Sequence, residues 1–431
     1  MKIYKAISPR FFRLFKESGW VFVGQVSSIA GAIILVMILT PRLNPSQYGL
    51  LAIGMTFANL IIQVVMGPLS SGAGRFYSIA ERKKDLIGYL YAIKKMVAYA
   101  TYIIIVVGIL LFFWLSSIEE SQWAWLVISA FVFAALSAYN SIINSIHNAA
   151  RKREIVALHI SLESWLKIIF ALVTITLFGV SGVVVIAGYT IAALCTLASQ
   201  SIFLHRLALK HKGNRINIDP WIKKIWIYSW PFAIWGIFGW LQQSSTRWAL
   251  EFFEDSHEVG LFAVVTQLGY MPMVILASMM TTFISPIFFS MIGGATDKNS
   301  KENVINLVRK TVYFGFLIIA CAVAISSFSH EYIFQLFVNE DYWMASHFLP
   351  YVVLAGGVFS IAQLYASKMM AFMLTDKLMF ASIGSSIIGI FSAYLGVYFY
   401  STFGAVLSLL VHAISYYLLL LLSVKRHIRG I

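Results

Sequence analysis

Amide and hydroxyl side chains recur at helical spacing inside several apolar stretches of the sequence. The longest series has offsets of three, four, seven and eleven residues from its first member and comprises Ser137, Asn140, Ser141, Asn144 and Asn148. Such offsets place the side chains on one face of a helix. Shorter series follow the same rule: Asn59 with Gln63, Gly236 with Gly239, Gln243 and Arg247, and Ser360 with Gln363 and Ser367. Taken singly, each series fits a polar cavity and, equally, hydrogen bonding between neighbouring helices.

Charged side chains are rare in the apolar stretches, and five lie in them or at their ends: Arg75, Glu163, Lys167, Arg247 and Lys368. Glu163 precedes Lys167 by four residues, which is the favourable order for a helical ion pair, so we interpret this pair as structural. Arg75 and Lys368 lie near predicted cytoplasmic ends, from which a long side chain can reach the membrane surface.

Arg247 differs from the other four charges because it shares a helix face with Gln243 and lies within a turn of the predicted outer boundary. Glu251 and Glu254 follow it by four and seven residues and could serve as its anionic partners. The alternative partner is an anionic substrate, because a guanidinium group binds phosphate through paired hydrogen bonds. We therefore predict a functional role for Arg247.

Motifs of the common catalytic and metal sites are absent from the sequence. It contains no GxxxxGK[ST] phosphate loop, no HExxH, no GxSxG and no Cys/His cluster with the spacing of metal ligands. The two cysteines, Cys195 and Cys321, lie in apolar stretches, which favours packing over redox chemistry. The sequence thus predicts no cofactor and no catalytic residue.

Membrane-spanning helices must position the polar series, because the composition leaves little surface for water. The 431 residues are 60% hydrophobic and 12% charged, against roughly 45–50% and 25% in soluble domains. Apolar stretches of about the length of one span lie near residues 20–40, 50–72, 96–116, 123–146, 164–180, 183–204, 227–250, 259–292, 311–328, 346–373, 379–399 and 404–424. The predicted fold class is an all-α polytopic membrane protein with about twelve transmembrane helices.

Loop charges predict the orientation. With a cytoplasmic N-terminus, the outer loops contain one cation, Arg42, and nearly all other lysines and arginines fall in cytoplasmic loops. Both termini are then cytoplasmic, as an amphipathic segment 1–19 and a tail 425–431. The net charge of +14 is spread over the cytoplasmic segments as topology anchors, with no single basic face, which argues against nucleic acid as a partner.

Three short motifs recur in the same order in the two halves of the chain. The pairs are 18–20 with 228–230, 49–52 with 260–263, and 94–97 with 309–312, at offsets of 210, 211 and 215 residues. Duplicated halves explain them, although shared topology could also produce such matches. We predict two six-helix bundles, 20–204 and 227–424, joined by a basic cytoplasmic linker, 205–226. An even number of helices in each half makes the repeats parallel, related by a pseudo-two-fold axis along the membrane normal.

Two segments resemble a known family. The connection Pro41 to Leu50 is similar to the LGP-x-x-YG-L segment of polysaccharide-export flippases, and Ser245-Thr246-Arg247-Trp248 followed by Val259-Gly260-Leu261-Phe262 resembles their SDR…VGxY pattern. These are the Wzx-type members of the multidrug/oligosaccharidyl-lipid/polysaccharide exporter superfamily. The chain departs from the pattern at Thr246, where the family often has Asp, which puts a cation-binding carboxylate in this helix in doubt.

The resemblance implies a two-bundle, MATE-like architecture in the bacterial inner membrane, and transport of undecaprenyl-pyrophosphate-linked oligosaccharides between the leaflets. The lipid bilayer and the lipid-linked substrate are the implied partners, with a polysaccharide polymerase or chain-length machinery as further candidates. We predict Arg247 with Lys368 or Arg75 as partners of the pyrophosphate. The predicted sugar contacts are Asn59, Gln63, Asn140, Asn144, Gln243 and Gln363.

Two other functions remain open. A MATE-like drug/cation antiporter would share the fold, but it needs a carboxylate embedded in a span, and we expect none to be available there. An integral-membrane polymerase or glycosyltransferase would act on the same lipid-linked glycans, using sizeable outer loops. The longest outer loop, about residues 329–345, is short for that purpose, although it carries Glu340 and Asp341.

Overall fold

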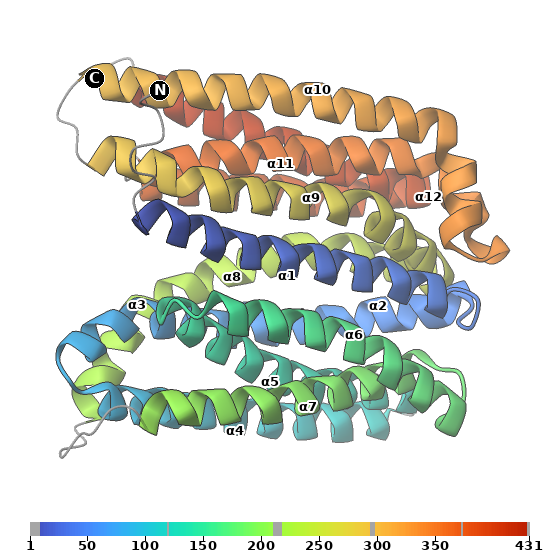
Figure 1. The fold of residues 1–431 in the computed structure, drawn as a ribbon. Helices are drawn as coiled ribbons and strands as arrows, with labels where there is room; N and C mark the ends of the chain where they lie inside the picture. The colour runs from blue at the N-terminus through green and yellow to red at the C-terminus, as the bar shows by residue number, and fades with distance from the viewer. Residues whose placement is uncertain (1–8, 119, 210–217, 294–297, 372–373, 429–431) are drawn as a thin grey trace. The chain divides into compact units, whose positions relative to one another are not determined.

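The protein is built from α-helices. The computed structural model describes residues 9–118, 120–209, 218–293, 298–371 and 374–428, and no strand occurs in these ranges. Parts of three predicted cytoplasmic segments, residues 1–8, 210–217 and 429–431, lie outside the described residues. Figure 1 shows the helices coloured along the chain.

Long helices follow one another with short connections. In chain order they are α1 (Pro9–Leu39), α2 (Pro45–Leu60), the π-helical turn η1 (Ile61–Met66), α3 (Gly67–Arg82), α4 (Leu86–Ser117), α5 (Ser121–Ala149), α6 (Arg153–Phe178), α7 (Gly182–Leu209), α8 (Asp219–Phe253), α9 (Ser256–Gly293), α10 (Lys298–Phe337), the 3-10 helix η2 (Glu340–Phe348), α11 (Leu349–Ala371) and α12 (Thr375–Ile428).

Ten helical segments of the described chain are long and apolar enough to cross a membrane, which supports a multi-pass membrane protein. Helix α8 is not among the ten, and the last segment, Lys377–Ser423, has 47 residues, over twice the roughly 20 that one crossing needs. Its helix α12 bends back at Ser401, where φ is 49° and ψ is −135°. Gly396 and Gly404 then meet backbone to backbone across the bend. The count of twelve spans stays a prediction.

The chain divides into two compact units that do not follow the halves of the sequence strictly. Unit 1 comprises Met1–Leu35 and Gly54–Trp240, and unit 2 comprises Val36–Ile53 and Leu241–Ile431. Compared with the predicted bundles, the end of α1 with the start of α2 belongs to unit 2, and the first part of α8 belongs to unit 1. Each boundary falls inside a continuous helix, α1, α2 or α8.

One helix is central in each unit. In unit 1, α5 packs against α3, α4 and α7, and α6 lies along α7 (Figure 1). In unit 2, α11 packs against α9, α10 and α12. Helix α5 contains the fourth predicted span and α11 makes up most of the tenth, so the two central helices are at equivalent places in the predicted repeat.

Helices α2 and α9 cross in unit 2 at two glycines, Gly49 and Gly260, that correspond in the predicted repeat. A Cβ on Gly49, in α2, would overlap the carbonyl oxygen of Ser256, and a Cβ on Gly260, in α9, would overlap that of Pro45. Both pairs, Pro45 with Ser256 and Gly49 with Gly260, are separated by 211 residues, the offset of one repeated motif. The contact is therefore reciprocal, as a local pseudo-two-fold axis requires, and only residues without a side chain allow two helix backbones to approach so closely.

Candidate functional site

A polar cavity of about 400 Å³ lies within unit 1, between α3, α5 and α6. Its lining residues are Ser70, Ser137, Ser141, Asn144, Ser145, Asn148, Ile160 and Glu163. Five of them come from the polar face of α5, and four of those five, all except Ser145, belong to the series that the sequence singled out. Polar groups inside a lipid-facing bundle are expensive unless they bind one another, water or a ligand.

Helix α3 is held against α5 by hydroxyl groups at one wall of this cavity. The Ser145 hydroxyl donates to the carbonyl of Ser70 at 2.7 Å, and the Ser70 hydroxyl donates to that of Ser141 at 3.4 Å. Gly74 lies one turn further along α3, and a Cβ there would come within 2.7 Å of the Ser145 oxygen. Small residues thus allow the close approach of the two helices.

Glu163 brings a carboxylate into the cavity from the middle of α6. Its oxygen lies 2.8 Å from the ammonium nitrogen of Lys167, so the predicted ion pair is present. The Ser137 hydroxyl and the Asn140 amide approach the same carboxylate at 3.4 and 3.5 Å. The expectation that the span interiors offer no embedded carboxylate is therefore wrong, because helix packing turns Glu163 toward the polar face of α5.

Lys167 also contacts an aromatic ring of α5. Its ammonium group lies 5.3 Å from the centre of the Phe133 ring, within the range of a cation–π interaction. The lysine therefore has two partners, an anion and an aromatic face. This arrangement compensates the charge of Glu163 inside the unit.

The two asparagines predicted to contact sugar have different surroundings. Asn140 is 1% exposed, and its amide donates to the carbonyl of Ala193 at 3.0 Å, so it lies behind the cavity wall and supports Glu163. Asn144 lines the cavity, and its side-chain oxygen accepts from the Gln200 amide at 3.0 Å. Ser70, Glu163 and Gln200 were not predicted as site residues, since only packing of α3, α6 and α7 on α5 reveals them.

Asn59 and Gln63 lie where α2 changes into the π-helical turn η1. Both side chains are partly buried, and the backbone of Gln63 lies directly against Gly236 of α8. The Trp240 indole donates to the carbonyl of Thr56 at 2.7 Å, in the same unit. A π-helical turn within an α-helix often marks a functional position. Here the turn faces two glycines of α8, Gly236 and Gly239.

Arg247 lies in the part of α8 that belongs to unit 2. Its Nε atom is buried and has no hydrogen-bond partner among the described residues, and Tyr48 is its nearby electrostatic neighbour. The Glu251 carboxylate accepts from the Ser256 hydroxyl at 2.8 and 2.9 Å. Within the described ranges neither Glu251 nor Glu254 forms an ion pair with Arg247, so the anchoring by nearby acids is not observed.

Lys368 is buried near the end of α11, with 5% of its surface exposed. Its charged neighbour is Arg309 at the start of the apolar part of α10, and no acidic partner occurs among the described residues. Gln363 lies five residues earlier on α11 and is partly buried, and Gln243 is exposed on α8. Among the residues that the structure describes, unit 2 thus contains a buried cation without a compensating carboxylate.

The structure does not bring Arg247 and Lys368 together. Tyr48, the neighbour of Arg247, packs edge to face on Tyr342 of η2, at 6.0 Å between ring centres, and η2 leads directly into α11. Lys368 lies 19 residues beyond Leu349, the first residue of α11, which at the helical rise is roughly 28 Å along the axis. The two cations therefore lie toward opposite ends of unit 2. Arg75 is exposed on α3, in unit 1.

The described residues contain no group of three or more His, Cys, Asp or Glu side chains arranged to hold a metal ion. The arrangement instead offers hydroxyl, amide and cationic groups. Groups of these kinds can bind neutral sugars by hydrogen bonds and anions by charge.

Several solved structures with a similar fold are a flippase or transporters. The chain is similar to the lipid II flippase MurJ in an inward closed conformation, with a TM-score of 0.71 and 16% identity over 95% of this chain and 87% of that one. It is similar to an inward-facing MATE family multidrug transporter of the MOP superfamily, with a TM-score of 0.62 and 15% identity over 93% and 94% of the two chains. A MOP superfamily transporter from Pyrococcus furiosus matches with a TM-score of 0.60 and 14% identity over 95% and 96%.

Sequence comparison gives the family. No curated protein matches the chain. Residues 14–292, well over half of the chain, match the family of polysaccharide biosynthesis proteins. The matched range includes both segments whose resemblance was noted above and the whole polar face of α5. The chain belongs to the polysaccharide biosynthesis protein family.

Proposed function

We propose that the protein is a flippase that moves a lipid-linked oligosaccharide across the bacterial inner membrane by alternating access, with both termini cytoplasmic. The substrate would be an undecaprenyl-pyrophosphate-linked repeat unit of a surface polysaccharide such as O-antigen, as in the Wzx-type flippases. The observation that carries the proposal is the polar cavity of α3, α5 and α6, with hydroxyl and amide groups around a compensated carboxylate.

This cavity suits the sugar part of such a substrate. Sugar hydroxyls lose their hydrogen bonds with water when they enter a membrane, and an unpaired polar group there costs several kcal/mol, roughly 2–7. Ser137, Ser141 and Asn144 offer replacement partners within unit 1. Asn59, Gln63, Gln243 and Gln363 are further candidate sugar contacts along the route, with Asn140 holding the cavity wall.

The pyrophosphate would meet cations one after the other. Lys368 and Arg247 lie toward opposite ends of unit 2, so one pyrophosphate group cannot contact both in this conformation. We assign Lys368 to the predicted cytoplasmic end of the route and Arg247 to the outer end, where its buried Nε lacks a partner. Arg75, exposed on α3, is the candidate for first contact.

The comparisons support transport rather than catalysis, since the similar structures are a flippase and MATE transporters, and the family is named for polysaccharide biosynthesis. A lipid-linked glycan is a substrate that fits both transport across a membrane and polysaccharide biosynthesis. A polysaccharide polymerase or chain-length machinery would then act on the product at the outer leaflet.

A MATE-like antiporter is the second candidate, and Glu163 is the observation that favours it. A carboxylate in a polar cavity within a span can bind a proton or a cation. Lys167 lies 2.8 Å away and already supplies a counter-charge. A cation would have to displace this ammonium group, which makes the antiporter the weaker proposal.

Complementation of a strain that lacks its own lipid-linked-glycan flippase tests the proposal. The readouts are surface polysaccharide and the leaflet in which the intermediate accumulates, with the cognate glycan supplied. We expect Arg247→Ala and Lys368→Ala each to lower export at least about ten-fold, which corresponds to about 1.4 kcal/mol. Arg42→Ala serves as the matched control, because Arg42 is an exposed arginine of a predicted outer loop whose side chain donates to the carbonyl of Ile38.

Full export by both alanine variants would overturn the assignment of the pyrophosphate contacts. Failure of the wild-type chain to export the cognate glycan, despite confirmed membrane expression, would overturn the flippase itself. In that case an assay of proton-driven efflux with the Glu163→Gln variant decides whether the antiporter takes its place.

A further inference from the structure

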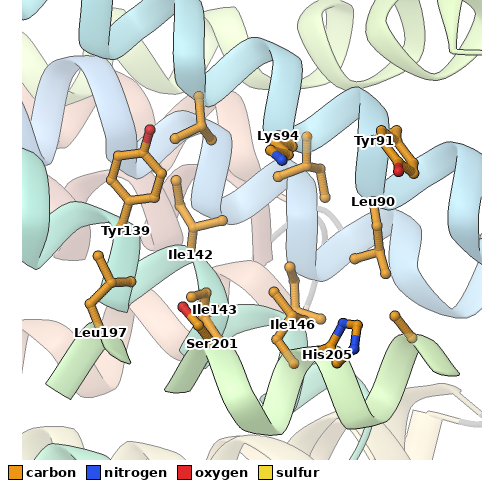
Figure 2. A pocket seen from close by; sticks show the side chains of 14 residues that line it. Leu90, Tyr91, Lys94, Tyr139, Ile142, Ile143, Ile146, Leu197, Ser201 and His205 are labelled. Carbon is orange, nitrogen blue, oxygen red and sulfur yellow. The ribbon is translucent and has the colours of Figure 1, made fainter. Parts of the chain in front are cut away.

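A second cavity in unit 1 has a different character. It measures about 470 Å³ and lies between α4 and α7, with α5 as its floor (Figure 2). Its inner wall consists of branched aliphatic side chains, among them Ile93, Val97, Ile142, Ile143 and Leu197. The cavity is open on one side, where Tyr91 and Ser201 are exposed. We call it the α4/α7 groove.

The α4/α7 groove and the polar cavity use different faces of α5. Ile142, Ile143 and Ile146 line the groove, whereas Ser141 and Asn144 line the polar cavity. Helix α5 therefore separates the two spaces. A molecule in the groove contacts the back of the helix whose front carries the sugar-binding candidates.

The groove opens onto a surface of exposed apolar side chains. Tyr91 on α4 is 50% exposed, and Leu194 and Ile202 on α7 are 53% and 55% exposed. Apolar side chains beside a concave apolar surface mark a binding groove, and in a membrane-spanning bundle their surroundings are hydrocarbon chains.

The basic side chains of the groove lining lie at one end of the groove. Lys94 and His205 line this end, together with Tyr91, as Figure 2 shows. It is the end where α4 begins, at Leu86, and α7 finishes, at Leu209, and the sequence predicts that it is cytoplasmic. Lys94 is exposed and has no ion pair or hydrogen bond with any described residue.

We propose that the α4/α7 groove binds one anionic phospholipid of the cytoplasmic leaflet. An acyl chain lies along Val97, Ile143 and Leu197, and the phosphate meets Lys94, His205 and the Tyr91 hydroxyl at the membrane surface. Charge complementarity carries the choice of head group, since a basic pocket between helices on the cytoplasmic side recognises anionic lipid heads.

The transported substrate is a poorer occupant than a phospholipid. Its sugars would have to remain in the cytoplasm while its lipid chain occupied the groove, because α5 stands between the groove and the polar cavity. The groove thus serves as a site for a resident lipid that packs against α5. This inference does not depend on which substrate the protein moves.

Native mass spectrometry of the purified full chain, delipidated in detergent and titrated with phosphatidylglycerol or phosphatidylethanolamine, tests the site. We expect one phosphatidylglycerol to bind before the others, and Lys94→Gln to weaken that binding about five-fold, the effect of roughly one lysine at an anionic surface. Lys95→Gln is the matched control, because Lys95 is the exposed neighbour outside the groove lining.

A second pair of variants tests the groove itself. Ser201→Trp fills the open side and should abolish the first binding event, whereas Ile202→Trp, one residue further and outside the lining, should leave it intact. Unchanged melting temperatures without lipid confirm that both variants fold. Equal effects of Lys94→Gln and Lys95→Gln, or retention of the first lipid by Ser201→Trp, would overturn the proposal. Preferential binding of a polyprenyl phosphate over phosphatidylglycerol would overturn the identity of the occupant.

Discussion

The central helices of the two units, α5 and α11, stand at equivalent places in the predicted repeat but handle charge differently. The polar face of α5 meets a carboxylate whose charge is balanced by Lys167 at 2.8 Å. Helix α11 carries Lys368, which is 5% exposed and has a like-charged neighbour, Arg309, with no acid among the described residues. The carboxylate in unit 1 is thus compensated by Lys167, whereas Lys368 in unit 2 has no counter-charge among the described residues.

Under the proposed function, this difference would divide the binding task. A neutral sugar would be bound by groups that have no net charge, and an anionic pyrophosphate would be bound by a cation without a counter-charge among the described residues. The folded state loses several kcal/mol of stability when one partner of a buried ion pair is removed. A buried charge without a partner already destabilises the folded state, so its removal costs no stability. The same kind of substitution should therefore have opposite effects in the two units.

The largest effect is expected when one partner of the unit 1 pair is removed. Lys167→Met should lower the free energy of unfolding by about 3 kcal/mol, because it leaves Glu163, partly buried in the bundle, without its counter-charge. Lys368→Met should leave it unchanged or raise it. Chemical unfolding of the purified protein in detergent measures both. The double variant Glu163→Gln with Lys167→Met should recover most of the lost stability. If the double variant is destabilised as much as Lys167→Met alone, the charge of Glu163 is not what Lys167 compensates.

Overlap at the glycine crossing of unit 2 should have the next largest effect. Gly49→Ala and Gly260→Ala should each lower the free energy of unfolding by about 2 kcal/mol, because the added methyl group meets backbone, which cannot give way as a side chain can. The reciprocal contact predicts similar losses for the two variants. Gly19→Ala, with nothing within 4 Å of the added atom, is the control. Clearly unequal losses would argue against the local pseudo-two-fold axis.

A smaller effect is expected at the wall of the polar cavity. Asn144→Leu removes the acceptor of the Gln200 amide, and loss of one such hydrogen bond costs about 1 kcal/mol of stability. We expect export to fall about ten-fold, more than this loss of stability accounts for, because the same side chain faces the sugar. Measuring surface polysaccharide at equal membrane expression separates the loss of sugar binding from the loss of stability. Normal export would remove Asn144 from the set of sugar contacts.

The smallest effect is expected at Thr246, which stands where the family pattern that the sequence resembles often has an acid. Its hydroxyl lies 3.4 Å from that of Ser408, a weak contact at the end of the hydrogen-bond range. Thr246→Ala should change the free energy of unfolding by no more than about 0.5 kcal/mol and should preserve export. A strong loss of export at normal stability would show that this hydroxyl takes over a role of the missing carboxylate.

The sequence by itself determined the helical class, the apolar segments and the polar face of α5. Backbone groups in lipid must be satisfied within a helix, and the period of 3.6 residues fixes which side chains share a face. It also predicted the Glu163–Lys167 pair, since residues four apart on a helix meet whatever surrounds them. These features depend only on the spacing of residues along the chain, which can be read directly from the sequence.

Tertiary structure alone decided which elements complete each site. Ser70 and Gln200 reach α5 from helices that lie far away in the sequence, and packing turned Glu163 into the lining of a cavity. Packing also decided that Arg247 and Lys368 lie toward opposite ends of unit 2, and that the end of α1 with the start of α2 belongs to that unit. Helix periodicity says which face a residue occupies, but the neighbour of that face is set by the packing of the whole bundle.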